Sequence, residues 1–222
     1  MRFAVLGSGS AGNAIVVEAS GRRLLIDAGF SCRRLVDRLR MLGVEARSLD
    51  GVLLTHEHGD HTRGARLLAR RFDLEVLATR GTLDGVVLDE TTRTRTIRSG
   101  EPFELAGLRV ESFALPHDAR EPVGFALEDS GGCRLGVVGD LGCRTQLAWA
   151  RLRDLDALVL ESNYDLQMLR SGPYPWVIKQ RIAGRHGHLS NEEAGHGLRE
   201  LVSDRLRHVV LYHLSQTNNL PA

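Results

Sequence analysis

The chain has 222 residues, of which 42% are hydrophobic and 26% are charged, and its formal net charge at pH 7 is +1. This composition predicts an ordinary globular protein, and the length suits a single domain, residues 1–222, with a sizeable core. The near-neutral charge excludes binding to nucleic acid through overall charge, so such binding needs a local basic patch. Three cysteines give no disulfide framework, and the lack of a signal peptide or a membrane-length apolar run predicts a cytoplasmic protein with no membrane contact.

The first part of the chain is predicted to form three short strands and a helix, at 3–6, 14–17, 23–26 and 31–42. The Gly-rich segment 7–13 joins the first two strands. It lacks the glycine spacing of a dinucleotide-binding loop and the Gly-Lys-Ser/Thr of a P-loop, and a strand follows it, so we predict a hairpin turn that could also line a site. Asp27, at the end of the third strand, is either a turn residue or the hydrogen-bond acceptor of a ligand histidine.

Residues 55–61, Thr-His-Glu-His-Gly-Asp-His, follow a short apolar strand and precede a predicted helix. Because side chains two apart on an extended segment point the same way, His56 and His58 can bind one ion together. Asp60 and His61 lie in the turn and can point towards a second ion. Imidazole and carboxylate ligands suit zinc, manganese and iron, and packing has no use for this spacing, so the motif predicts a metal site.

The rest of the chain alternates between predicted strands and helices. Strands are predicted at 74–78, 108–115, 123–128, 134–138, 157–161 and 208–212, and helices at 82–88, near 145–152 and from Glu192, with Ser190 or Asn191 as its cap. Residues 91–100 are expected to form an exposed strand or loop, and residues 171–190 to be irregular. The arginines at 33–40 and 91–98 could form basic tracks, although a solvated helix face explains the first group as well.

Several polar residues share one position, directly after an apolar strand. They are Asp27, the central motif, His117, Asp140, Ser162-Asn163 and His213. Such strand ends collect ligands and catalytic groups in layered α/β folds. Five of the nine histidines, with Asp60 and Asp140, make seven candidate ligands, whereas one tetrahedral site needs about four. The excess indicates two ions that share a bridging carboxylate.

This HxHxDH pattern, followed by a distant His, Asp and His, resembles the metallo-β-lactamase fold superfamily. The resemblance implies an α/β fold, a four-layer αββα sandwich, with two divalent ions, Zn²⁺ or Mn²⁺ or iron. It also implies that a water between the ions is deprotonated and attacks an electrophilic centre. The implied roles are as follows: His56, His58 and His117 hold the first ion; Asp60, His61 and His213 hold the second; Asp140 bridges the two; Asp27 supports a ligand from behind; and Asp60 also orients the nucleophile.

Other stretches narrow the resemblance to the WalJ/YycJ group of bacterial proteins. They are residues 7–13, Glu161-Ser162-Asn163, 172–175, 187–191 and 213–219. That group is nuclease-like, with 5′-to-3′ exonuclease action on DNA, and the resemblance implies a metal-dependent hydrolase of this kind with a nucleic-acid substrate. His188 would bind the scissile phosphate or protonate the leaving oxygen, unless it only makes local hydrogen bonds in a capping loop. Ser215 and Asn218 would contact a phosphate.

Two other functions stay open from the sequence. One is a thioester or lactone hydrolase of the glyoxalase II type, which shares the HxHxDH core; the other is a non-catalytic metal-binding protein, which the complete ligand set argues against. The chain also departs from the group in two respects. Tyr164 stands where relatives often carry His, so we assign it no catalytic role, and the chain ends at residue 222, short of such relatives, which predicts a C-terminal truncation.

Overall fold

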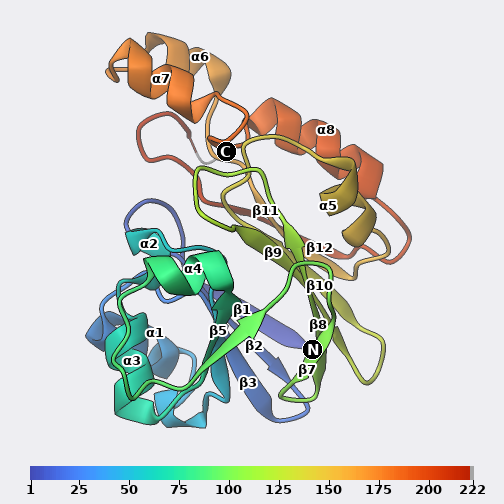
Figure 1. Cartoon of the computed structure of the whole chain (residues 1–222). Coiled ribbons are helices and arrows are strands. Elements are labelled where there is room, and N and C mark those ends of the chain that lie inside the picture. The colour runs from blue at the N-terminus through green and yellow to red at the C-terminus, as the bar shows by residue number, and fades with distance from the viewer. Residues whose placement is uncertain (221–222) are drawn as a thin grey trace.

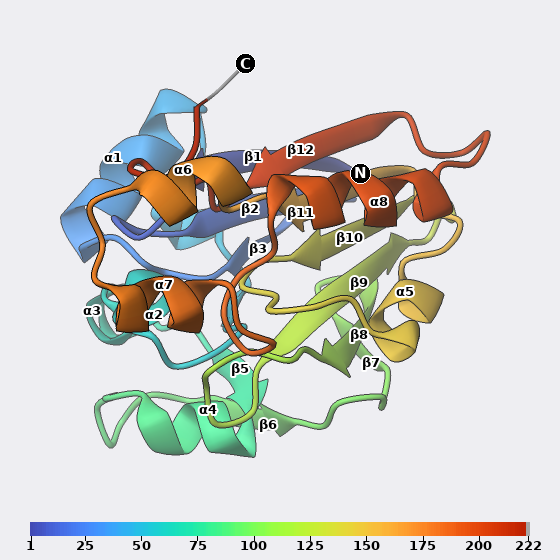
Figure 2. The ribbon, with the colours of Figure 1, turned by 90° about the horizontal axis from the view of Figure 1, so that it is seen from above.

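A computed structural model of the chain describes residues 1–220. Two six-stranded sheets lie face to face, and helices cover the outer face of each (Figures 1 and 2). The first sheet has the strand order β1-β2-β3-β4-β5-β6, with bounds Arg2–Gly7, Ala14–Ala19, Arg22–Ile26, Gly51–Leu53, Val76–Thr79 and Thr94–Ile97. The second has the order β12-β11-β10-β9-β8-β7, with bounds His208–Tyr212, Ala157–Glu161, Arg134–Val138, Val123–Asp129, Leu108–Ala114 and Phe103–Leu105.

The central strands are apolar on both faces, which follows from the layering. In β2, Ile15 and Val17 point into the core between the sheets, whereas Ala14 and Val16 point into the core beneath the helices. Side chains alternate along a strand, so a strand with a core on each side must be apolar at every position. The predicted four-layer αββα architecture is confirmed.

The outer layers are formed by four helices. Helices α1 (Cys32–Met41) and α3 (Ala65–Phe72) cover the first sheet, and α5 (Gln146–Arg151) and α8 (Asn191–Leu201) cover the second. The predicted cap of α8 is confirmed, because the Ser190 hydroxyl accepts from the backbone N–H of Glu193 at 3.1 Å. In the described residues no helix is long and apolar enough to cross a bilayer.

The structure corrects two of the predicted elements. The helix predicted at 82–88 is α4 (Arg80–Gly85), which begins earlier because the Thr79 hydroxyl caps it. The segment 171–190, expected to be irregular, contains α7 (Trp176–Ile182), which follows another short helix, α6 (Leu166–Ser171). Two prolines in this segment predicted irregular structure. Pro175, however, lies at the start of α7, where its missing N–H removes no helical hydrogen bond.

Both sheets contain a run of parallel strands, β3-β4-β5-β6 in the first and β10-β11-β12 in the second. Parallel strands end at the same edge of a sheet. The candidate residues that follow β3, β4, β10, β11 and β12 are therefore brought to one rim of the sandwich, where α2 (Gly59–Thr62) also lies (Figure 1).

Candidate metal centre

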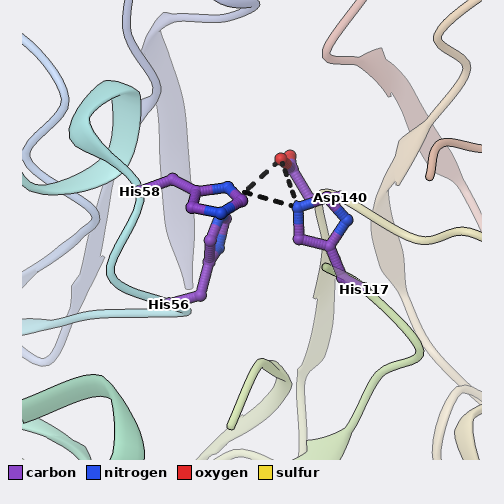
Figure 3. Close-up of side chains that lie close together, drawn as sticks. All are labelled: His56, His58, His117 and Asp140. Atoms are coloured by element: carbon purple, nitrogen blue, oxygen red, sulfur yellow. Dashed lines mark hydrogen bonds and ion pairs between the residues drawn. The ribbon is translucent and has the colours of Figure 1, made fainter. Parts of the chain in front are cut away.

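The structure brings all seven candidate ligands together at this rim. They form two groups of four that share Asp140: His56, His58, His117 and Asp140 in the first, and Asp60, His61, Asp140 and His213 in the second. Within each group, one possible donor atom per residue lies within 4.8 Å of the others. In Figure 3 the four side chains of the first group point towards one another from both sheets.

The spacing within the first group suits a small cation. The Nε2 atoms of His56 and His117 lie 3.6 and 3.4 Å from Asp140 Oδ2, and His117 Nε2 lies 3.4 Å from His58 Nδ1. Four tetrahedral ligands about 2.1 Å from a metal are roughly 3.4 Å apart. His56, His117 and Asp140 are buried, and His58 is half-buried.

The second group uses the other carboxylate oxygen of Asp140. His61 Nε2 lies 3.3 Å from Asp140 Oδ1 and 3.8 Å from Asp60 Oδ2, and His213 Nε2 lies 3.6 Å from Asp60 Oδ2. Asp140 thus presents one oxygen to each group, which is the arrangement that a bridging carboxylate requires.

Hydrogen bonds on the side away from the metal centre orient the histidine rings. Nδ1–H of His61 donates to Asp27 Oδ2 at 2.7 Å, and Nδ1–H of His56 donates to Thr55 Oγ1 at 3.0 Å, whose hydroxyl in turn donates to Asp27. Nδ1–H of His117 donates to the Gly187 carbonyl at 2.9 Å. Each bond assigns the ring proton to Nδ1 and leaves Nε2 facing the centre, as metal-binding histidines require.

The backbone is strained at three residues of the site. Asp27, Asp140 and His213 have φ values of 60°, 31° and 55°, in the left-handed region that non-glycine residues rarely adopt. Asp27 and His213 directly follow a strand, and a single residue, Gly139, separates Asp140 from the end of β10. Such strain is typical of functional sites, where the surrounding structure holds an unfavourable conformation.

The residues present fit divalent cations. In the described chain, His56 Nε2, His213 Nε2 and Asp140 Oδ1 are buried without a hydrogen-bond partner. Buried polar atoms are normally paired, and leaving them unpaired is costly, so three such atoms aimed at common points indicate an absent partner. The carboxylates around His213 favour positive charge at this place. Burial disfavours the imidazolium of His213, but Asp140, Asp60 and Glu161 outweigh burial and raise its pKa to about 10. Imidazole and carboxylate donors together favour zinc, manganese or iron.

The segment 7–13 also lines the site. The backbone N–H of Asn13 donates to the Asp60 carbonyl at 2.8 Å, and its Nδ2 lies 2.9 Å from His61 Nε2. Gly29 packs against the same turn, where a Cβ atom would lie 1.7 Å from the Asp60 carbonyl oxygen. Only glycine allows so close an approach of the two backbones.

Sequence reasoning missed Glu161 as a site residue. This carboxylate is fully buried at the end of β11 and accepts from Nδ1 of both His188 and His213, at 2.8 and 2.9 Å, and from the N–H groups of Leu141 and Leu189. Its position at the end of an apolar strand was the available signal, the same one that identified Asp27 and Asp140.

His188 faces the cleft beside both groups. Its ring centroid lies 5.3 Å from that of His117 and 5.1 Å from that of His213. Burial lowers the stability of its charged form, but the Glu161 carboxylate outweighs this effect and raises the pKa of His188 above its usual value. Because Nδ1 is engaged by Glu161, Nε2 is the atom that can reach a ligand.

Two residues expected to contact a phosphate lie elsewhere. Asn218 is 1% exposed, and Ser215 Oγ accepts from the backbone N–H groups of Thr217 and Asn218 inside its own loop. Neither lines the cleft. Tyr164 is buried and pairs with the chain at Ser190.

The cleft above the two groups has a volume of about 280 Å³. Its floor includes His58, Asp60, His117, Asp140 and His213, and His188 borders it. The opposite wall is made by Ile178, Arg181 and Ile182 of α7, which lies over α2 when the molecule is seen from above (Figure 2). Residues of a short helix therefore line the same cleft as the metal-binding groups.

The fold and the paired metal groups define a metallo-β-lactamase-type protein, and comparison with known proteins agrees. The beta-lactamase superfamily domain matches residues 22–214, so the chain belongs to this family. Exodeoxyribonuclease YycJ of Bacillus anthracis is 35% identical, with 99% of this chain and 84% of the relative aligned. Exodeoxyribonuclease WalJ of Streptococcus pneumoniae D39 is 30% identical, with 99% and 83% aligned. Among solved structures, zinc-bound PqqB from Methylobacterium extorquens shares the fold, with a TM-score of 0.74 at 23% identity, covering 98% of this chain and 90% of PqqB.

Proposed function

We propose that this protein is a dinuclear metal-dependent phosphodiesterase that degrades DNA from the 5′ end. The observation that carries the proposal is the pair of donor groups sharing Asp140, set beside a histidine that is hydrogen-bonded to a buried carboxylate. The relatives named exodeoxyribonuclease support the choice of DNA as substrate.

The position of each side chain determines its proposed role. His56, His58 and His117 would hold one cation, Asp60, His61 and His213 a second, and Asp140 both. Two bound Zn²⁺ or Mn²⁺ ions would supply an activated water at neutral pH and would stabilise negative charge on the phosphate. Asp60, the most exposed of the carboxylates, would also orient the attacking water from the cleft side.

His188 would act as the general acid. Its Nε2 would donate a proton to the leaving alkoxide of the DNA chain, and Glu161 would hold the ring through Nδ1 and favour its protonated form, since this carboxylate raises the pKa of His188. A positioned histidine of this kind contributes roughly 10²–10⁴-fold to such a reaction.

The first test is an assay of the metal-free protein reloaded with Mn²⁺ or Zn²⁺ on 5′-labelled and 3′-labelled duplex DNA, single-stranded DNA and RNA. We expect mononucleotides to be released, with the 5′ label released first, and we expect Asp60→Ala to abolish release. Intact polynucleotides with metal-loaded wild-type protein would overturn the proposal. A thioester hydrolase of the glyoxalase II type is not favoured, because the relatives with near-complete coverage carry the nuclease name.

A further inference from the structure

Helix α7, which forms one wall of the cleft, has an uncovered apolar surface. It buries none of its residues, and Trp176, Val177 and Ile178 are 67%, 72% and 39% exposed. Short helices depend on packing an apolar face against a partner. Of these side chains, Ile178 lines the cleft together with Ile182, one turn further along. The wall therefore offers apolar contact to whatever enters the cleft.

The segment that contains α7 is locally basic along the sequence, a feature that a near-neutral chain needs in order to bind nucleic acid. Residues 166–191 contain four Arg or Lys and no Asp or Glu, in a chain with a net charge of only +1. The two arginine groups expected from the sequence, at 33–40 and 91–98, do not serve this purpose, because none of their arginines lines the cleft. Several of them also pair with acidic neighbours, as Arg95 does with Glu75.

Arg181 connects this basic segment to the metal centre. Its Nε and Nη2 donate to Asp118 Oδ2 at 2.8 and 2.7 Å, and Asp118 directly follows His117. Both side chains are more than half exposed, and exposed ion pairs contribute little stability. Guanidinium binds phosphate at least as well as carboxylate, through two parallel hydrogen bonds. Asp118 thus occupies the position that a phosphate group entering the cleft would take.

The end of α7 is fixed to the catalytic groups. The His188 N–H donates to the Ile182 carbonyl at 2.9 Å, and the turn between them supplies the Gly187 carbonyl that orients His117. The backbone at the end of α7, next to Arg181, is therefore hydrogen-bonded to the segment that positions His117 and His188.

We propose that α7 is the wall along which the polynucleotide lies: Arg181 exchanges Asp118 for the backbone phosphate next to the scissile one, while Ile178 packs against a sugar or base. The inference rests on the proposed nuclease activity and assigns the residue that makes the site prefer a polynucleotide over a small phosphodiester.

The test uses the Mn²⁺-loaded protein, a single-stranded oligonucleotide and bis-(p-nitrophenyl) phosphate, a diester that has no phosphate beyond the scissile one. We expect Arg181→Ala to raise KM for the oligonucleotide about tenfold, with a smaller change in kcat, and to lower the preference for oligonucleotide over the small diester by a similar factor. The slope of log KM against log salt concentration should fall by about 0.7, the value for one phosphate contact on a single strand. Asp118→Asn should lower KM, because the competing carboxylate charge is gone.

Arg66→Ala is the matched control, because Arg66 on α3 makes an equivalent Nε–carboxylate pair with Asp89 at 2.8 Å, outside the cleft lining. It should leave KM and the salt slope unchanged. Binding of a fluorescent oligonucleotide in EDTA separates this inference from the proposed activity. If wild type cleaves neither substrate but Arg181→Ala weakens binding, the nuclease proposal fails and the assignment of α7 stands. An Arg181→Ala protein with the wild-type KM, salt slope and oligonucleotide affinity would overturn the assignment.

Discussion

Asp27 supports both metal groups at once. It accepts a hydrogen bond directly from His61 and, through the Thr55 hydroxyl, is linked to His56, so one carboxylate orients a ligand of each group. The Thr55 N–H also donates to it at 2.9 Å, which fixes the start of the HxHxDH turn to the end of β3. The role of Asp27 is therefore to hold ligands that the local spacing has already brought close.

We predict that Asp27→Asn lowers affinity for Zn²⁺ or Mn²⁺ by roughly 10–100-fold, because the amide cannot hold the His61 ring as an anionic acceptor does. Affinity should be measured by competition with a chromogenic chelator, with circular dichroism to show that the variant is folded. Asp37→Asn, an exposed change on α1, serves as the control and should bind like wild type. Equal affinities for Asp27→Asn and wild type would show that the hydrogen bond between Asp27 and His61 does not contribute to metal binding.

His188 can be tested through the leaving group. An alkoxide leaving from DNA needs a proton, whereas p-nitrophenolate leaves readily without one. We therefore predict that His188→Ala lowers kcat on DNA by roughly 10²–10⁴-fold and lowers kcat on bis-(p-nitrophenyl) phosphate much less. Metal content measured on the same samples controls for loss of the ions. Equal losses on both substrates would indicate a positioning role in place of proton donation.

At the scale of elements, residues at the strand ends form the site. Carboxylate side chains hydrogen-bond to the loops that connect the strands. Asp156, before β11, illustrates this: its Oδ2 accepts from the Arg134 N–H at 2.7 Å and from Arg205 at 2.6 Å, so it joins the start of β10 to the approach to β12. The Arg205 guanidinium, with the Arg134 N–H, lowers the pKa of Asp156. Asp156 thus connects the starts of neighbouring parallel strands.

We predict that Asp156→Asn destabilises the protein by about 1 kcal/mol at pH 7, the usual net worth of such a bond. The folded-state pKa of this carboxyl is depressed, so its contribution is present above the unfolded value of about 3.9 and is lost as the pH falls through the folded value. Urea unfolding at pH 7 and near pH 3 would measure this, with the difference between variant and wild type shrinking at low pH. A difference that is constant with pH would show that ionisation is not involved.

At the scale of the whole molecule, the two sheets each supply part of both metal groups. The HxHxDH turn follows β4 of the first sheet, whereas His117, Asp140 and His213 follow strands of the second. Neither sheet can bind an ion fully without the other. Cations bound between them would therefore tie together the two halves of the sandwich, in addition to the apolar core they share.

We predict that Zn²⁺ or Mn²⁺ stabilises the folded chain, by about 2.7 kcal/mol at a free concentration 100 times Kd. For a chain of this size, such a gain corresponds to a rise in Tm of roughly 5–10 °C. Calorimetry of the EDTA-treated protein with and without added metal would measure the shift. Asp140→Asn, which removes the shared carboxylate charge, should show a much smaller rise, and an unchanged Tm in wild type would contradict two-sheet binding.

The sequence by itself was enough to predict the site residues whose arrangement depends on local spacing or on a repeated pattern. The spacing of His56, His58 and His61 is fixed by backbone periodicity, and the apolar strands before Asp27, Asp140 and His213 could be recognised because burial on both faces demands continuous apolar runs. Most strands followed from the same signals, although β7 was not predicted, and the four-layer arrangement was an implication of the resemblance that the HxHxDH pattern carries.

Only the tertiary structure decided what depends on distant partners. The role of Glu161 arises from His188 and His213, which lie 27 and 52 residues further along the chain. The burial of Asn218, the acidic neighbours of the two arginine groups and the position of α7 over the cleft are equally non-local. Burial, ion pairing and cleft position are properties of packing between segments far apart in sequence, and spacing along one segment does not encode them.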